Sequence, residues 1–300
     1  MNLRHVSPLR YPGGKASLAG FLEDVIDLND LRGCKYFEPY AGGAGAALTL
    51  LDRNVVDEIH INDADLRVFA FWSAALNETE RFADRVLEVP LDMDEWRRQR
   101  QICSSPTAHG AFDVGFSAFY MNRCNRSGVL TGAGPIGGLQ QTGKWKLNAR
   151  FSREALAQRI RQVGTKRERI RLSGKDAIDF LKSSLPSGKA RRKVFVYLDP
   201  PYVNNGQRLY LNSYRPEDHS EIAGYLSMQK VLPWLMSYDA AELIKQLYRE
   251  HRLFELPIRY SLQEKKTASE LIISPLGMIL PRSVEVHGIR TSFFQPTKPS

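Results

Sequence analysis

The clearest chemical feature of the chain lies where the apolar run Val194–Leu198 ends in Asp199, Pro200, Pro201 and Tyr202. Proline cannot donate to a sheet ladder and pushes the preceding residue out of the helical region, so the chain must leave its strand extended and stiff. A carboxylate, a proline carbonyl and an aromatic ring are therefore held side by side. Two fixed acceptors suit the hydrogens of an exocyclic amino group on a flat base, with Tyr202 stacked on its ring.

That amino nitrogen is normally a poor nucleophile, because its lone pair is delocalised into the ring. Holding its hydrogens on pre-set acceptors favours the pyramidal, nucleophilic geometry as the transition state forms, without reorganisation during the reaction. The alternative interpretation of these residues is a rigid strand exit that has no chemical role.

A second candidate site follows the predicted strand that ends at Glu38, Pro39 and Tyr40, in the turn Gly42-Gly43-Ala44-Gly45. Glycines between a strand and a helix let the backbone approach a ligand, and the helix N-terminus offers free amide donors. The full GxGxxG spacing is absent, which disfavours a NAD site. Packing of the helix on the strand is the alternative role of these glycines.

Two aspartates, Asp63 and Asp176, also follow predicted strands. Asp63 lies about 20 residues after the glycine turn, where an acid can accept hydrogen bonds from ribose hydroxyls. Its alternative role is to cap the next helix, although Asp65 is better placed for that. Asp176 either caps the helix after it or accepts a hydrogen bond from the amino group of an adenine ring.

Lys15 follows two glycines and Tyr11 in the stretch RYPGGK. The stretch resembles a phosphate-binding loop, but the GxxxxGK[ST] spacing is absent. The ordinary interpretation is a turn before the first helix, and the lysine could instead pair with a ligand carboxylate.

Hydrophobic periodicity predicts the elements that position these residues. Helices are predicted at residues 17–29, 46–52, 66–76, 93–103, 112–124, 176–184 and 240–250, and strands at 35–39, 58–63, 169–174, 193–199, 231–237, 253–262 and 270–275. This alternation predicts an α/β fold with a mostly parallel sheet, helices on both faces and an antiparallel hairpin at one edge. The candidate acids all follow strands, at the ends where such sheets bind ligands.

The composition predicts a soluble protein, since no apolar leader and no bilayer-length segment is present among the 300 residues. The three cysteines have neither disulfide-framework nor zinc-site spacing, so the reducing cytoplasm is the expected location and no metal is expected. The net charge of +9 is concentrated between Trp96 and Arg171, where 15 Lys and Arg stand against three acids. A segment of one sign favours a polyphosphate partner, namely nucleic acid.

The segment 90–164 interrupts the alternation and contains a long glycine-rich stretch. A loop of that length inside a domain is usually functional. We therefore predict a catalytic domain of residues 1–89 and 165–300 with an inserted, mainly helical module of residues 90–164.

Taken together, these motifs resemble the Dam-like DNA adenine methyltransferases, which use S-adenosylmethionine. The shared pieces appear in the family's order: RYPGGK, FEPYAGGAGAAL, IND, LDPPY, VLPWLMSY and KKTASELIIS. The resemblance covers nearly the whole chain and implies a Rossmann-like methyltransferase sheet, a target-recognition insert and an adenine flipped out of the duplex. The family often has Trp where Tyr11 stands.

The resemblance also implies roles for individual residues. Asp199, Pro200, Pro201 and Tyr202 would be catalytic, with Asp199 bordering both cofactor and target. Residues expected to contact the cofactor are Tyr11, Lys15, Pro39, Tyr40, Gly42, Gly43, Gly45, Asp63 and Asp176.

Base flipping costs a few kcal/mol of stacking and pairing, which contacts from the insert must offset. Candidates for phosphate or guanine contacts are Arg123, Arg126, Lys144, Lys146 and Arg150, and candidates for adenine edges are Asn122, Asn125 and Gln140. Each basic residue could equally be a solvated surface charge.

Three alternatives to an adenine-specific DNA methyltransferase share some of these features. A methyltransferase of RNA or of a protein amide would share the pocket without needing a basic insert tuned to duplex DNA. A non-catalytic DNA-binding relative would tolerate loss of Asp199 or Tyr202, and both are present. A nicotinamide oxidoreductase is disfavoured by the glycine spacing. Solitary, phage-borne and restriction-linked enzymes share this chain plan, so a partner endonuclease stays open.

Overall fold

The computed structural model describes residues 6–10, 15–203, 214–259, 267–286 and 289–292. The main sheet has seven strands in the order β3-β2-β1-β4-β5-β7-β6. Its strands are β1 (Cys34–Glu38), β2 (Val56–Asn62), β3 (Ile170–Ser173), β4 (Val194–Leu198), β5 (Trp234–Asp239), β6 (Arg252–Arg259) and β7 (Thr267–Ser274). A separate hairpin pairs β8 (Ser283–Val286) with β9 (Ile289–Ser292). The predicted mixed α/β fold is confirmed.

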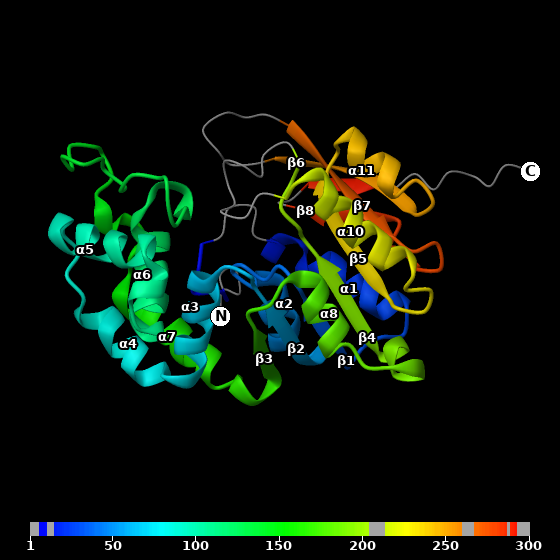
Figure 1. The fold of residues 1–300 in the computed structure, drawn as a ribbon, viewed down its shortest axis with the longest axis horizontal. Helices are drawn as coiled ribbons and strands as arrows, with labels where there is room; N and C mark the ends of the chain where they lie inside the picture. Colours follow the sequence, from blue (N-terminus) through cyan, green and yellow to red (C-terminus); the bar gives the residue numbers. More distant parts are fainter. Residues whose placement is uncertain (1–5, 11–14, 204–213, 260–266, 287–288, 293–300) are drawn as a thin grey trace, which may run out of the picture. The chain divides into compact units, whose positions relative to one another are not determined.

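The helices are, in chain order, α1 (Ala19–Leu28), α2 (Gly45–Asp52), α3 (Leu66–Asn77), α4 (Thr79–Glu88), α5 (Met93–Ser104), α6 (Ala111–Cys124), α7 (Arg153–Gly164), α8 (Ala177–Ser184), α10 (Pro216–Ser227) and α11 (Glu242–Leu247). A short 3₁₀ turn, η2 (Lys15–Leu18), precedes α1. Figure 1 traces these elements along the chain. The sequence pattern located most of them but missed α4, α7 and α10.

The centre of the sheet is where strand order reverses. β1 and β4 are parallel neighbours, with Tyr36 opposite Phe195, although most of the chain separates them in sequence. β4 also pairs in parallel with β5, whereas β7 is antiparallel to β5 and to β6. Every residue of β4 and β5 is buried, which explains their unbroken apolar runs. In open sheets of this type, ligands bind beyond the carboxyl ends of the strands at the reversal point.

Contact density divides the chain into two compact units. The first comprises residues 1–14, 40–45 and 60–180, and the second comprises residues 15–39, 46–59 and 181–300. The first unit therefore includes more residues than the predicted insert of residues 90–164. The physical reason is that α3 and α4, which precede that segment, pack against α6 and α7.

The helical part of the first unit, α3 to α7, is built around α6, which is buried along most of its length (Figure 1). The rings of Phe71 and Phe119 stack with centroids 6.0 Å apart, and Phe82 meets Phe116 and Phe119 at 5.4 and 5.5 Å. A Cβ added at Gly115 would lie 2.4 Å from the carbonyl oxygen of Ala70, so α6 and α3 cross in backbone contact there. This core holds α3 to α7 together as one folded body.

Cys34, Cys103 and Cys124 are free thiols in the interior. Among the described residues, no helix is both long and apolar enough to cross a membrane.

Candidate functional site

Asp199 follows the end of β4, and its carboxylate is held in place through one of its two oxygens. Asp199 Oδ1 accepts a hydrogen bond from Ser237 Oγ of β5 at 2.9 Å and lies 3.2 Å from Lys15 Nζ. Ser237 is itself hydrogen-bonded to Tyr197 at 2.8 Å. All hydrogen bonds and ion pairs of Asp199 with described residues involve Oδ1. Oδ2 is therefore the oxygen left for a ligand.

Pro200 and Pro201 are buried, and Tyr202 is only 7% exposed. The Tyr202 hydroxyl donates to Glu270 Oε1 at 2.6 Å and receives a hydrogen bond from Lys15 Nζ at 2.7 Å. The tyrosine is thus fixed at its polar end, which leaves the ring as the part that can face a base. This matches the stiff strand exit that the double proline predicts.

The side chain of Lys15, the first residue of η2, is paired. Its ammonium group lies between two buried carboxylates, 3.2 Å from Asp199 Oδ1 and 3.0 Å from Glu270 Oε1. These ion pairs raise the pKa of Lys15, although burial acts most strongly and in the opposite direction. Burial raises the pKa of Asp199, while Lys15 lowers it and Glu270 raises it further. The sequence interpretation gave no role to Glu270, which lies about 70 residues after the corner, because strand alternation alone marks it only as an inward-facing position.

Glu38, at the end of β1, is also buried. Burial raises its pKa to about 8, and the nearby Asp199 charge acts in the same direction. The carboxyl group of Glu38 is therefore mostly protonated at neutral pH, so Asp199 and Glu270 supply the negative charge around Lys15.

The first unit contains the glycine turn and Asp63. The N–H of Gly42 donates to Asp63 Oδ2 at 2.9 Å, and the N–H of Asp65 donates to Asp63 Oδ1 at 2.9 Å. Trp72 Nε1 donates to the Gly42 carbonyl at 2.8 Å, and Gly42 has a φ of +46°. This left-handed conformation is one that glycine adopts at no steric cost.

Burial raises the pKa of Asp63 to about 7, against the lowering effect of the two amide donors. Its side chain is only partly covered, so it stays accessible to a hydroxyl donor. Asp65 takes the N-cap of α3 by accepting from the N–H of Arg67 at 2.9 Å, as the sequence predicted. Asp63 is consequently not needed as the cap.

For Asp176 the structure supports the capping role. Its Oδ1 accepts from the N–H of Ile178 at 2.8 Å and from that of Asp179 at 3.3 Å, at the start of α8. Of the other predicted cofactor contacts, Pro39, Gly42 and Gly43 are buried and Tyr40 and Gly45 are partly exposed, whereas Tyr11 lies outside the described residues.

Two of the proposed base-reading residues have internal roles instead. Asn122 is fully buried, and its amide donates to the carbonyls of Arg10 and Gly128 at 2.7 and 2.8 Å. Asn125 is also fully buried; it accepts from Trp96 Nε1 at 2.9 Å and donates to the Val129 carbonyl at 2.8 Å. The expectation that these two amides contact adenine edges is wrong for this conformation, because both are occupied in holding loops.

Arg123 is likewise buried, at 5% exposure, and donates to the Pro8 carbonyl. Burial and the neighbouring Arg159 and Arg10 lower its pKa to about 9. Burial also lowers the pKa values of Arg10 and Arg159, and Arg150 lowers that of Arg10 further. Within the described residues, Arg10 Nη1 and Arg123 Nε are buried without a hydrogen-bond partner. Arg10, Arg123 and Arg159 form a buried to partly buried cationic cluster, with the exposed Arg150 beside Arg10. No described carboxylate pairs with these arginines, an arrangement that is unfavourable without an anion.

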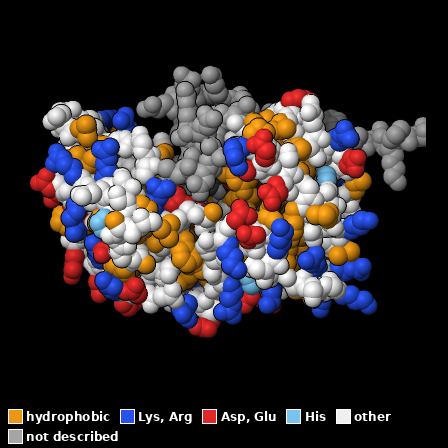
Figure 2. All heavy atoms as spheres, in the orientation of Figure 1, with side chains coloured by type: hydrophobic (Ala, Val, Ile, Leu, Met, Phe, Trp, Pro, Cys, Tyr) orange, Lys and Arg blue, Asp and Glu red, His pale blue; other side chains and the backbone are white. Residues whose placement is uncertain are grey.

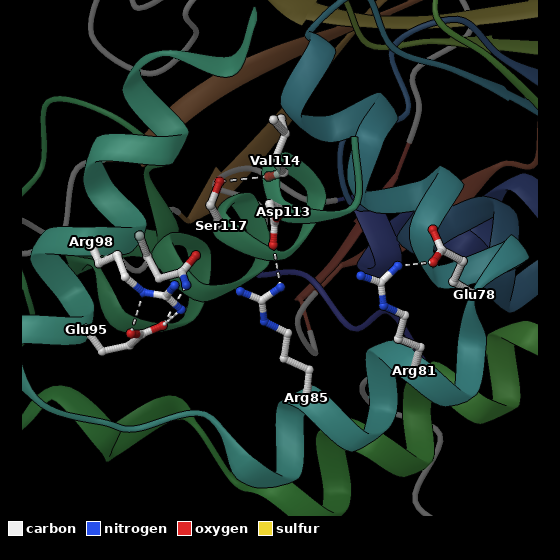
Figure 3. Close-up of polar contacts among 9 residues, drawn as sticks. Glu78, Arg81, Arg85, Glu95, Arg98, Asp113, Val114 and Ser117 are labelled. Atoms are coloured by element: carbon white, nitrogen blue, oxygen red, sulfur yellow. Dashed lines mark hydrogen bonds and ion pairs between the residues drawn. The ribbon is translucent and has the colours of Figure 1, made fainter. Parts of the chain in front are cut away.

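Elsewhere in the helical part, many basic residues are paired. Arg85 of α4 reaches Asp113 of α6 at 2.5 Å, and Arg98 meets Glu95 within α5 at 2.8 Å, as Figure 3 shows. Arg161 of α7 lies 2.8 Å from Glu80 and 3.1 Å from Asp84. Figure 2 shows acidic side chains interspersed with basic ones over the visible face of this part. The count of charges between Trp96 and Arg171 therefore overstates the unpaired positive charge. Acidic residues of α4 and α5 form ion pairs with basic residues of this segment.

The remaining candidates are exposed, as surface contacts require: Arg126, Gln140, Lys144, Lys146 and Arg150. Arg126 lines a pocket of about 210 Å³ together with Trp96, Arg100, residues 132–135 and residues 138–139. Lys144 Nζ lies 5.8 Å from the centroid of the exposed Trp145 ring. Among the described residues, no group of three His, Cys, Asp or Glu could hold a metal ion.

Among curated proteins, none matches. Among solved structures, the chain is similar to the rRNA methyltransferase aviRa from Streptomyces viridochromogenes, with 12% identity, 91% of this chain and 89% of that chain covered, and a TM-score of 0.33. A TM-score that low carries no argument about function.

The family comparison is decisive. Residues 11–266 match the model of the D12 class N6 adenine-specific DNA methyltransferases. The match spans both the glycine turn and the Asp199–Tyr202 corner. The chain therefore belongs to the D12 class N6 adenine-specific DNA methyltransferase family and is an enzyme that methylates adenine in DNA.

Proposed function

We propose that this enzyme takes its methyl group from S-adenosylmethionine and delivers it to the N6 amino group of an adenine turned out of duplex DNA. The observation that carries the proposal is the fixed carboxylate of Asp199, with Oδ1 held by Ser237 and Lys15 and Oδ2 left for a ligand. The buried proline pair and the anchored Tyr202 complete a surface that fits a flat base with an amino group.

The residues of the glycine turn fit a nucleoside cofactor. Asp63 is a partly exposed carboxylate whose orientation is fixed by the N–H of Gly42, and such a group suits a ribose diol. Gly43 and Gly45 continue the turn into α2, and Pro39 and Tyr40 precede it. We assign these residues, Asp176 and Tyr11 to cofactor binding. When bound, S-adenosylmethionine supplies a methyl group activated by its sulfonium charge.

The chain's own groups prepare the acceptor. Asp199 Oδ2 and the Pro200 carbonyl accept the two N6 hydrogens, which lets the nitrogen become pyramidal and releases its lone pair from the ring. As N6 forms its new bond it becomes positively charged, and the Asp199 carboxylate stabilises this charge. Because the acceptors are already oriented, little reorganisation accompanies the step. The proton that N6 then loses passes to Asp199 or to solvent.

The arginine cluster of Arg10, Arg123, Arg150 and Arg159 fits the DNA phosphates. A phosphate would neutralise the charge of this cluster and offset the burial that lowers the pKa values of Arg10, Arg123 and Arg159. The exposed Arg126, Gln140, Lys144 and Lys146 remain candidates for base and backbone contacts.

The test is transfer of tritium from methyl-labelled S-adenosylmethionine to four substrates: duplex DNA, single-stranded DNA, RNA and a protein extract. We expect label on duplex DNA that, after digestion to nucleosides, elutes as N6-methyldeoxyadenosine. Label on RNA or protein alone would overturn the duplex assignment. An unlabelled duplex together with labelled single strands would instead reject base flipping.

A further inference from the structure

Lys15 and the Tyr202 hydroxyl each contact both Glu270 and Asp199, and each lies closer to Glu270. Lys15 Nζ lies 3.0 Å from Glu270 and 3.2 Å from Asp199, and the Tyr202 hydroxyl lies 2.6 Å from Glu270 and 3.4 Å from Asp199. The side chains of Lys15, Asp199 and Glu270 are 7%, 13% and 2% exposed. Solvent therefore screens these interactions little.

The position of Glu270 follows from the antiparallel edge of the sheet. β7 runs against β5, and Glu270 stands opposite Asp239, the last residue of β5. The early residues of β7 thereby lie beside the carboxyl end of β5, where Ser237 and the corner of β4 also lie. An antiparallel strand brings a side chain to this end of the sheet from a sequence position remote from the other site residues.

The charge balance explains what this carboxylate does. With one ammonium between two carboxylates, Lys15 neutralises only part of the negative charge. Without Glu270, Lys15 and the Tyr202 hydroxyl would still have Asp199 Oδ1 within 3.2 and 3.4 Å and would turn toward it. Asp199 would then be more strongly engaged at Oδ1 and a weaker acceptor for a substrate amine.

We propose that Glu270 is a positioning residue of the methyl transfer, holding Lys15 and the Tyr202 hydroxyl so that Asp199 stays available to the adenine amino group. The proposal rests on the proposed function of the Asp199 corner. Glu270 acts through Lys15 and Tyr202 and needs no contact with either substrate.

The experiment compares Glu270→Gln with the wild-type enzyme in single-turnover methylation of duplex DNA. We expect the rate constant to fall at least about tenfold, because the reacting groups lose their alignment, while DNA affinity stays within about twofold. Glu270→Asp, which keeps the charge, should recover part of the rate. Glu255→Gln is the matched control: Glu255 lies on the adjacent β6, is exposed, and pairs with Lys245 at 2.8 Å.

The pH profile separates this role from a merely structural one. The groups that influence Asp199 are Lys15, Glu270, Tyr202, Tyr197, Glu38 and Tyr238. Because the charge of Glu270 raises the pKa of Asp199, its removal should move the acidic limb of the rate profile to lower pH. A slower enzyme with an unmoved acidic limb would overturn the proposal, as would a wild-type rate in a folded Glu270→Gln variant.

A titration of Asp199 itself tests the role of Glu270 without relying on DNA binding or methylation. Carbon-13 NMR titration of the Asp199 carboxyl, assigned with Asp199→Asn, should give a lower pKa in Glu270→Gln than in wild type. That shift is expected even if the wild-type enzyme methylates a different substrate. An unchanged Asp199 titration would contradict the proposal, whereas lack of DNA methylation by the wild type would contradict only the proposed function.

Discussion

The side-chain amide of Asn122 brackets the backbone of Arg10: Oδ1 accepts the Arg10 N–H at 2.7 Å, and Nδ2 donates to the Arg10 carbonyl at 2.7 Å. Helix α6 is thereby fastened to Arg10, the first residue of the RYPGGK motif. Gly128 completes the contact, since a Cβ there would lie 2.4 Å from the Arg10 carbonyl oxygen. The residue that sequence reasoning assigned to base reading is a structural clamp.

Asn122→Ala should destabilise the protein by about 3 kcal/mol, because Arg10 and Gly128 lose hydrogen bonds in the interior. Urea denaturation measures this loss. The variant should also bind DNA more weakly, through displacement of Arg10, but with unchanged preference among sequences. A changed sequence preference at unchanged stability would mean that Asn122 reads a base after all.

Asp199→Ala should reduce methyl transfer by at least about a hundredfold, because the amine loses its fixed acceptor. DNA binding, measured by fluorescence anisotropy, should change little. Asp94→Ala, at an exposed carboxylate paired with Arg97, is the control for loss of a negative charge. Normal methylation by the Asp199 variant would contradict the assigned acceptor.

Glu38 should make stability depend on pH. Its pKa is about 8 in the folded protein against an ordinary value of 4.5, so the folded state keeps a proton that the unfolded state releases. Stability should therefore fall as pH rises from about 4.5 to about 8, by up to about 1.4 kcal/mol per pH unit, and then level off.

Glu38→Gln keeps a neutral group of the same shape at every pH and should flatten this dependence. Urea denaturation at pH 5, 7 and 9 tests the expectation: the variant should gain stability over wild type as pH rises. Glu255→Gln, at an exposed site, should follow the wild-type curve. A difference between Glu38→Gln and wild type that does not grow with pH would show that Glu38 ionises normally.

Arg159→Gln should weaken DNA binding and reduce the slope of log affinity against log salt concentration by about one, because one phosphate contact is lost. Arg161→Gln is the matched control on the same helix. Arg161 is already paired with Glu80 and Asp84, so its removal should leave the slope unchanged. Equal effects of the two substitutions would count against the arginine cluster as the phosphate site.

Local chemistry was predictable from the sequence. The Asp199–Tyr202 corner and the N-cap at Asp65 depend on proline and capping rules that act within a few residues. The strand and helix alternation also predicted the sheet and the placement of acids at strand ends, since side-chain periodicity is a local property.

The partners of those residues were decided by the tertiary structure. Glu270 reaches Lys15 across 255 positions of sequence, and Arg161 meets Glu80 across 81. Asn122 and Asn125, which the sequence predicts to contact bases, are buried and hold loops together instead. Arg123 is a buried cation. Sequence spacing shows which groups the chain carries, but hydrogen bonds and ion pairs form between whichever groups the packed elements bring within about 3 Å, and their strength depends on the water that packing excludes.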